Sequence, residues 1–102
     1  MIFLHTTLKR KDSAERVARS VVTEKIAAHV NYWPVSSVYR HAGEVYENEG
    51  YSMVFSTLSS KVPEIEAHIN QEEAHTVHMI ARIQVDVMND LYKKWVSDRL
   101  RM

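Results

Sequence analysis

"VSSVYRHAGEVYENEGYSMVFSTL", residues 35–58, predicts a long antiparallel hairpin. Residues 35–41 and 44–58 are rich in β-branched and aromatic side chains, and the Ala-Gly pair between them is typical of a tight turn. A strand continuous from 44 to 57 spans roughly 45 Å, whereas a compact domain of this length is only about 35 Å across. We therefore expect the hairpin to project beyond the rest of the protein, with a bulge or bend at Gly50.

The segments on either side of the hairpin predict two further strands and three helices, because their apolar residues recur with strand or helix periods. These are a strand at residues 2–8, a helix from Asp12 to about Ala28, a helix that begins at Ser59 or Ser60, a strand at residues 76–86 and a helix at residues 89–100. This order predicts a single domain over residues 1–102. It is a ferredoxin-like βαββαβ sandwich of the α/β (α+β) class, with an antiparallel four-stranded sheet and an extra C-terminal helix.

The first helix is expected to end at Ala27 and Ala28, whose small side chains would let its last turn lie close to the sheet. His29 would then lie at the C-terminal end of the helix, where a cation is favoured. Pro34 would prevent further helix and mark the start of the extended segment.

The composition excludes several classes of protein. Thirteen basic residues balance thirteen acidic ones, which argues against a nucleic-acid-binding protein. The chain has no cysteine, so neither a disulfide framework nor thiolate chemistry is expected. The start "MIFLHTT" is too short for a signal peptide or a membrane-spanning helix. We expect a cytoplasmic protein without membrane or nucleic-acid partners.

The expected hairpin and the uncovered sheet face both point to association between chains. An isolated two-stranded ribbon is marginally stable in water, and this one carries several aromatic residues. It would pair edges with a partner or cover the open sheet face of one. The alternative is that the ribbon bends at Gly50 and folds back on its own domain.

Two segments resemble the divalent-cation tolerance protein CutA family. They are "EKIAAHVNYWPVSSVYRHAGEV", residues 24–45, and "LYKKWV", residues 91–96. The positions that match the family's motifs are Glu24, Lys25, Ile26, Ala27, Ala28, Pro34, Ser37, Tyr39, Gly43, Tyr92 and Trp95.

The resemblance implies a homotrimer of ferredoxin-like subunits, with long hairpins that wrap around the neighbouring chains. It also implies a link to tolerance of divalent metals, especially copper, without a settled enzymatic reaction. The trimer contacts that we predict on this basis are Trp33, Tyr39, Gly43, Tyr46, Tyr51, Tyr92 and Trp95.

The chain departs from the family's pattern at several positions. His29 and His5 stand where the family often has cysteine, and His41 replaces a tryptophan of the hairpin. Residues 56–57 read Ser-Thr where the family has Lys-Thr. Residues 73–79, "EAHTVHM", replace a His-Pro-Tyr-Glu-x-Pro-Glu run that lines the family's cleft between subunits. The role of this segment, and any ligand in that cleft, is not fixed by the sequence.

Six histidines are the only surplus of chemically active residues. His5 and His29 are the candidate metal ligands, for copper or zinc, because imidazole can replace thiolate. The alternative is that both are packing residues, since a structural zinc site has four ligands. His75 and His78 would lie on opposite faces of a strand, and His68 has no evident partner.

Glu47 and Glu49 share one face of a strand. They could act in acid–base chemistry, bind a hard cation or form ion pairs at an interface.

Three functions remain open at this stage. The first is a non-enzymatic homotrimer linked to the response to divalent metal ions, with no certain cofactor and with weak binding of copper or zinc left open. The second is a trimeric small-molecule sensor similar to the PII proteins, with its ligand between subunits. The third is an enzyme on the same fold, similar to acylphosphatase. The glycine-rich, nucleophile and metalloprotease motifs of common enzymes are absent from the sequence.

Overall fold

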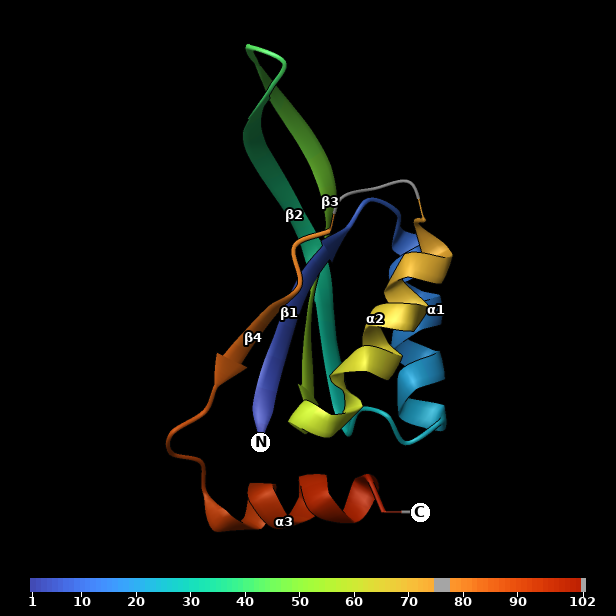
Figure 1. Cartoon of the computed structure of the whole chain (residues 1–102), viewed down its shortest axis with the longest axis vertical. Helices are drawn as coiled ribbons and strands as arrows, with labels where there is room; N and C mark the ends of the chain where they lie inside the picture. Colours follow the sequence, from blue (N-terminus) through green and yellow to red (C-terminus); the bar gives the residue numbers. More distant parts are fainter. Residues whose placement is uncertain (75–77, 102) are drawn as a thin grey trace.

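The computed structural model describes residues 1–74 and 78–101 as one layered domain, shown in Figure 1. The elements follow the predicted order, and a short 3-10 turn precedes the second helix. They are β1 (Ile2–Leu8), α1 (Lys11–Thr23), β2 (His29–His41), β3 (Glu44–Thr57), η1 (Ser59–Lys61), α2 (Val62–Glu72), β4 (Ala81–Gln84) and α3 (Asp90–Arg99). In the described part of the chain, no helix is long and apolar enough to cross a membrane.

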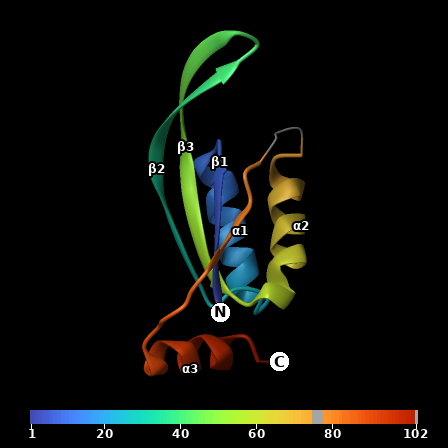
Figure 2. The same ribbon diagram turned by 60° about the vertical axis from the view of Figure 1, so that its left-hand side comes forward.

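The four strands form one sheet in the order β2-β3-β1-β4, and every neighbouring pair is antiparallel. Figures 1 and 2 show α1 and α2 side by side on the same face of this sheet. The opposite face, which we call the open face, carries neither of these helices. The predicted ferredoxin-like sandwich with one uncovered sheet face and an extra C-terminal helix is confirmed.

The main core lies between the sheet and the two long helices. Every second residue of β1 is buried, from Ile2 to Leu8, because alternate side chains of a strand point to the same face. Removing each large aliphatic side chain from water stabilises the fold by about 1.5–3 kcal/mol. The helices contribute a buried stripe to this core: Ala14, Val17, Ala18 and Val21 from α1, and Val62, Ile65 and Ile69 from α2.

The hairpin of β2 and β3 projects beyond the body of the protein, as predicted. Its pairing is continuous from His29 opposite Ser56 to His41 opposite Glu44. The strand β1 reaches only as far as the pair of Leu8 and Tyr51. Beyond that point lies what we call the arm, residues 35–50. The arm gives the molecule a longest dimension of 46 Å, against 27 and 21 Å for the others.

The turn at the tip of the arm is the predicted two-residue turn. Ala42 and Gly43 have φ angles of 51° and 80°. A positive φ at both central positions is the signature of a type I′ turn, whose twist matches that of the flanking strands. The tight turn therefore sends β3 straight back along β2.

A bulge at Gly50, one of the two predicted alternatives, is wrong, because Gly50 pairs directly with Val35 in an unbroken register. The reason for glycine here is a close approach of two backbones. A Cβ atom at position 50 would lie 2.7 Å from the carbonyl oxygen of Leu8, where β1 ends. Gly50 thus lets β3 pass the end of β1 and continue into the arm.

The predicted end of the first helix is also wrong, because α1 stops at Thr23 rather than near Ala28. Lys25 has a φ of 61°, and its N–H bonds to the carbonyl oxygen of Val22. The N–H of Ile26 reaches back to Val21. These two hydrogen bonds, together with the left-handed conformation of Lys25, form a Schellman motif, which ends a helix sharply.

Because the helix ends early, β2 begins at His29 and runs through Pro34. Pro34 does not mark the start of the strand as predicted. The strand tolerates proline because β2 lies at the edge of the sheet, where a missing N–H need not break a central ladder.

The alanine pair has a different role from the predicted one. Ala27 belongs to the main core, whereas Ala28 packs in a second cluster with Val96 and Leu100 of the C-terminal segment. Figure 1 shows α3 lying across the end of the sheet, next to the N-terminus. The small side chain of Ala28 therefore serves the docking of α3, not a close approach of α1.

The last strand is shorter than predicted. Of the expected residues 76–86, residues 76 and 77 lie outside the described part, and only Ala81–Gln84 form β4. Nε2 of His78 lies 2.9 Å from the carbonyl oxygen of Glu73, to which it donates a hydrogen bond. This contact joins His78 to the end of α2, and pairing with β1 starts at Ala81.

Candidate functional site

The open face is built from residues that alternate with those facing the helices. In β1 they are Phe3, His5 and Thr7, because Ile2, Leu4, Thr6 and Leu8 face the helices. The register extends this face across β3 to Ser52, Val54 and Ser56, and across β2 to Trp33, Asn31 and His29. Both candidate metal ligands therefore lie on the open face.

The imidazole of His5 is engaged by a serine on the neighbouring strand. Nε2 of His5 lies 2.7 Å from Oγ of Ser52, which is only 4% exposed. This distance is typical of a full hydrogen bond and would also suit a serine nucleophile with its base. The burial of Ser52 leaves little access for a substrate.

The structure does not bring His5 and His29 together. His5 lies opposite Val54, whereas His29 lies opposite Ser56 on the far side of β3. Two strand spacings separate them by roughly 10 Å across the sheet. In residues 1–74 and 78–101 no three histidine, cysteine, aspartate or glutamate side chains are gathered to hold a metal ion. Metal binding by this pair stays a prediction.

The residue opposite His29 connects the sheet to the C-terminal helix. The hydroxyl of Tyr92 donates a hydrogen bond to Oγ of Ser56, at 3.0 Å. The ring of Tyr92 stacks on that of Trp95, with centroids 5.6 Å apart, and the guanidinium of Arg99 lies 5.4 Å from the Trp95 ring centre. Two of the predicted trimer contacts thus form one aromatic unit at the lower end of the molecule.

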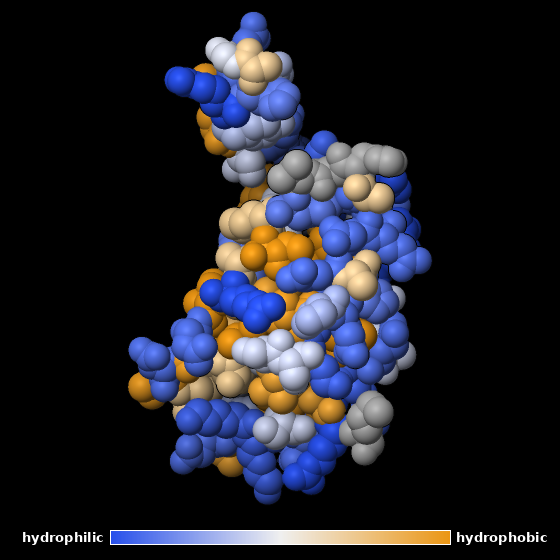
Figure 3. Space-filling model, in the orientation of Figure 1, coloured by the Kyte–Doolittle hydropathy of each residue, from blue (hydrophilic) through white to orange (hydrophobic). Residues whose placement is uncertain are grey.

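The arm exposes apolar side chains on both of its faces. On the face continuous with the open face, Tyr39 and Tyr46 stack with centroids 5.9 Å apart, and Asn48 donates a hydrogen bond to the Tyr39 hydroxyl. On the other face, Val38 and Val45 are 67% and 68% exposed. Figure 3 shows the arm standing out from the body through a narrow neck, with the surface hollowed below it. A ribbon with this much exposed apolar area is suited to contact with another protein surface.

The remaining residues predicted as trimer contacts differ in how exposed they are. Trp33 is exposed on the open face at the base of the arm, and Gly43 is at its tip. Tyr51 faces the helices and is half-buried against the main core. Tyr32, which was not among the predicted contacts, is also exposed near the base, beside Pro34 on β2.

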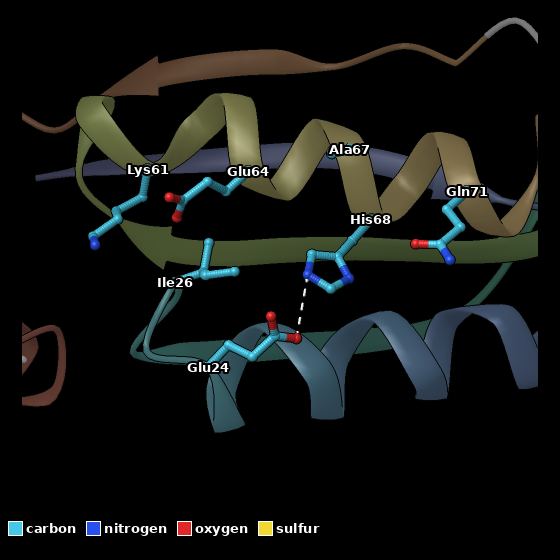
Figure 4. Close-up of a pocket in the computed structure, with 7 residues that line it drawn as sticks. All are labelled: Glu24, Ile26, Lys61, Glu64, Ala67, His68 and Gln71. Carbon is cyan, nitrogen blue, oxygen red and sulfur yellow. Dashed lines mark ion pairs between the residues drawn. The ribbon is translucent and has the colours of Figure 1, made fainter.

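A groove lies between the two long helices and is separate from the open face, as Figure 4 shows. Its volume is about 390 Å³, and its lining residues are Glu24, Ile26, Lys61, Glu64, Ala67, His68 and Gln71. Nε2 of His68 lies 3.3 Å from a carboxylate oxygen of Glu24. The sequence suggested no partner for His68, because this pair depends on how α1 and α2 pack.

The segment that replaces the family's cleft motif has a structural role at its first residue. The carboxylate of Glu73 is buried and accepts hydrogen bonds from the backbone N–H groups of Lys9 and Arg10, at 3.0 and 3.2 Å. These donors belong to the loop just before α1. Glu73 therefore ties the end of α2 to the start of α1, whereas His75 lies outside the described residues.

The charged residues near the start of α1 form a surface network. The Arg10 guanidinium, hydrogen-bonded to the Asp12 carboxylate, lowers the pKa of Asp12 to about 2. The hydrogen bond from Arg16 to Glu72 raises the pKa of the Arg16 guanidinium. The network links α1 to α2 at their exposed ends and lies apart from the open face.

Comparison with known proteins places nearly the whole chain beside one family. A family model described as "CutA1 divalent ion tolerance protein" matches residues 2–99. The divalent-cation tolerance protein CutA of Pyrococcus horikoshii is 27% identical over 101 residues, which cover 99% of this chain and 99% of that protein. The chloroplastic protein CutA of Arabidopsis thaliana is 26% identical over 98% of this chain, and the chain spans 56% of that relative's length.

Solved structures of similar proteins have the same fold. The crystal structure of CutA1 from Pyrococcus horikoshii matches with a TM-score of 0.89 at 26% identity, over 100% of both chains. A protein from Archaeoglobus fulgidus, described as a periplasmic divalent cation tolerance protein, matches with a TM-score of 0.91 at 24% identity. That match covers 99% of this chain and 100% of the other, so the likeness includes the arm and α3.

Proposed function

Because the chain belongs to the CutA1 divalent ion tolerance protein family, we propose that it is a non-enzymatic homotrimer that acts in the response to divalent metal ions. The open faces of three copies turn toward one another, and each arm reaches onto a neighbouring chain. The number of copies in the assembly is inferred from the family resemblance. The contact surfaces are inferred from the arm and the open face of this chain.

The arm carries this proposal. It extends past the end of β1, and among the described residues no third strand pairs with it. Val38 and Val45 are two-thirds exposed on one face, and the Tyr39–Tyr46 stack is on the other. A free ribbon of two strands is marginal in water, whereas a ribbon packed on a second chain buries this area and is stabilised.

A non-enzymatic role is supported by the burial of a pair whose spacing would suit catalysis. His5 and Ser52 are close enough for proton transfer, but Ser52 is almost fully buried. It lies on the face that the trimer would cover. A substrate would therefore have no route to the hydroxyl, and we interpret the pair as a structural hydrogen bond.

Sedimentation equilibrium tests the assembly. The wild type is expected at three times the 11.9 kDa mass of one chain. Val45→Lys places a charge on the exposed face of the arm and is expected to shift the protein toward monomer. Val22→Lys is the matched control, since Val22 is also exposed but lies on α1, away from the arm and the open face. A monomeric wild type, or equal behaviour of the two variants, would contradict the proposal.

Growth of cells that lack the protein tests the link to metals. Cells without it are expected to grow more slowly as Cu²⁺ or Zn²⁺ is raised, and the wild-type gene is expected to restore growth. The Val45→Lys variant is expected to restore it less well than Val22→Lys, because the function requires the assembly. Unchanged growth of the deficient cells at every metal concentration would argue against the function.

A further inference from the structure

We propose that the groove between α1 and α2 binds a divalent transition-metal ion, with His68 and Glu24 as its first two protein ligands. His68 is on α2 and Glu24 follows the last residue of α1, and both side chains line the groove. Figure 4 shows the imidazole of His68 and the carboxylate of Glu24 pointing toward each other. The site is separate from the open face, where His5 and His29 lie.

The distance between the two ligand atoms fits a shared ion. Nε2 of His68 and the Glu24 oxygen are 3.3 Å apart. A charge-assisted hydrogen bond would be shorter, at about 2.7–2.9 Å. A tetrahedral ion bound at about 2.0–2.1 Å from nitrogen and about 2.0–2.2 Å from oxygen requires these atoms to be about 3.3–3.5 Å apart. The pair, which forms an ion pair when His68 is protonated, also has the spacing of two ligands of one ion.

The backbone positions of both ligands are fixed by the fold. The His68 side chain is 23% exposed and is held on α2 between the buried positions Ile65 and Ile69. Glu24 closes α1, and its N–H bonds to the carbonyl oxygen of Ser20 at 2.9 Å. The Schellman motif that follows fixes the direction of the chain at this point. Little ordering of the backbone is needed for an ion to bind.

Glu64 is the other carboxylate that lines the groove. It lies one turn before His68 on α2, and side chains four residues apart share one face of a helix. Since no three such side chains are already gathered in the described residues, Glu64 joins only by changing rotamer. Water would occupy the remaining positions, which makes this an open and exchangeable site.

The charge of the groove favours a cation. Glu24 and Glu64 each contribute one negative charge and Lys61 one positive charge, so the lining carries a net charge of −1 while His68 is neutral. An imidazole nitrogen with carboxylate oxygens suits zinc, copper, cobalt or nickel, whereas calcium and magnesium prefer oxygen ligands alone. In the proposed metal response, the ion would bind at this groove, on the helical side of the molecule. The physiological meaning of the site rests on that proposed function.

Calorimetric titration with Zn²⁺ at neutral pH tests the site in the intact protein. His68→Gln and Glu24→Gln are each expected to weaken binding about tenfold or more, because even the loss of an outer-shell partner of a metal site costs about 10–100-fold. His41→Gln and Glu66→Gln are the matched controls, because His41 lies at the tip of the arm and Glu66 is outside the groove lining. Equal binding by the wild type and His68→Gln would overturn the proposal.

A second variant keeps the test independent of any loss of folding. Glu24→His places a second imidazole at the same spacing and is expected to bind Zn²⁺ about tenfold more tightly than the wild type. Titration with Co²⁺ is expected to give intense visible bands for a tetrahedral site in this variant and weaker bands in the wild type. A variant no tighter than the wild type and without these bands would also overturn the site. Sedimentation tests the proposed assembly separately from the metal site. A trimer that binds no metal would contradict only the metal site, and a monomer that binds metal would contradict only the assembly.

Discussion

Gly50 passes so close to Leu8 that a Cβ atom at position 50 would lie 2.7 Å from the Leu8 carbonyl oxygen. This contact lies where β1 ends and the arm begins. The two strands are paired there through backbone atoms, which cannot move aside as a flexible side chain would. The absence of a side chain at position 50 is therefore a condition for the arm to leave the sheet in register.

Gly50→Ala is expected to lower the free energy of unfolding by about 1–3 kcal/mol, the usual range for overpacking at a rigid contact. Urea denaturation at one fixed protein concentration measures the change, because an oligomer's stability depends on concentration. Glu49→Ala, at the exposed neighbouring position, is expected to stay within about 0.5 kcal/mol of the wild type. A neutral Gly50→Ala would mean that β1 can shift to accept the methyl group.

Two buried threonines on the core face are expected to respond in opposite directions to the same substitution. Oγ1 of Thr6 has no hydrogen-bond partner in the described residues, whereas Oγ1 of Thr57 donates to the carbonyl oxygen of Ile26 at 2.7 Å. Thr6→Val is expected to raise the unfolding free energy by about 1 kcal/mol. Thr57→Val is expected to lower it by about 1–2 kcal/mol, because the Ile26 carbonyl would lose its partner.

Each threonine variant is the control for the other, since both residues are fully buried on the same face of adjacent strands. Thermal and urea unfolding of both variants would give the two signs. Destabilisation by Thr6→Val equal to that of Thr57→Val would show that the Thr6 hydroxyl is satisfied in solution.

Glu73 and Glu72 are adjacent glutamates with different expected contributions. The Glu73 carboxylate is buried on the backbone N–H groups of Lys9 and Arg10, whereas Glu72 pairs with Arg16 at the surface. Glu73→Gln is expected to lower the unfolding free energy by about 1.5–3 kcal/mol, the contribution of hydrogen bonds to a charged group. Glu72→Gln is expected to change it by less than about 1 kcal/mol. Amide hydrogen exchange at Lys9 and Arg10 should rise only in the Glu73 variant.

Asp12 gives a pH dependence whose sign follows from its lowered pKa. The Arg10 hydrogen bond lowers the pKa of the folded protein's Asp12 from 3.8 to about 2. A carboxyl group whose pKa falls on folding stabilises the protein above its unfolded pKa, and this contribution is lost as the pH falls through the folded pKa. The wild type should therefore lose its advantage over Asp12→Asn between about pH 4 and pH 2.

Unfolding curves of the wild type and Asp12→Asn across that range give the measurement. Added salt is expected to reduce the difference between them, because the pair is exposed and its attraction is screened. A difference that persists unchanged at pH 2 would show that the ion pair is not its cause.

The fold was predictable where local patterns matched the tertiary structure. The Ala42-Gly43 turn, the β-branched and apolar composition of residues 2–8 and the length of the hairpin predicted the architecture correctly. The errors arose where a special backbone conformation overrode a continuing pattern. The apolar residues Ile26 to Ala28 continue the helical pattern by one more turn. Lysine is not a residue type that predicts a left-handed conformation, so the positive φ of Lys25 could not be inferred.

The candidate sites were predictable only in part, for a different reason. The exposed aromatic residues of the arm follow from its geometry, so the surface could be inferred from strand length. The pairing of His68 with Glu24 joins residues on two helices and depends on how these helices pack. Likewise, the burial of Glu73 on the loop before α1 depends on tertiary distances that no local motif records.

Pro34 has one more consequence for the arm. It lies in β2, which is an edge strand of the sheet formed by the described residues. A missing N–H on that edge prevents an incoming strand from forming an unbroken ladder, so runaway fibre growth by edge-to-edge stacking is blocked at this residue. The same proline that interrupts the ribbon's edge thus acts as a gatekeeper, which favours a closed, finite complex over an endless polymer.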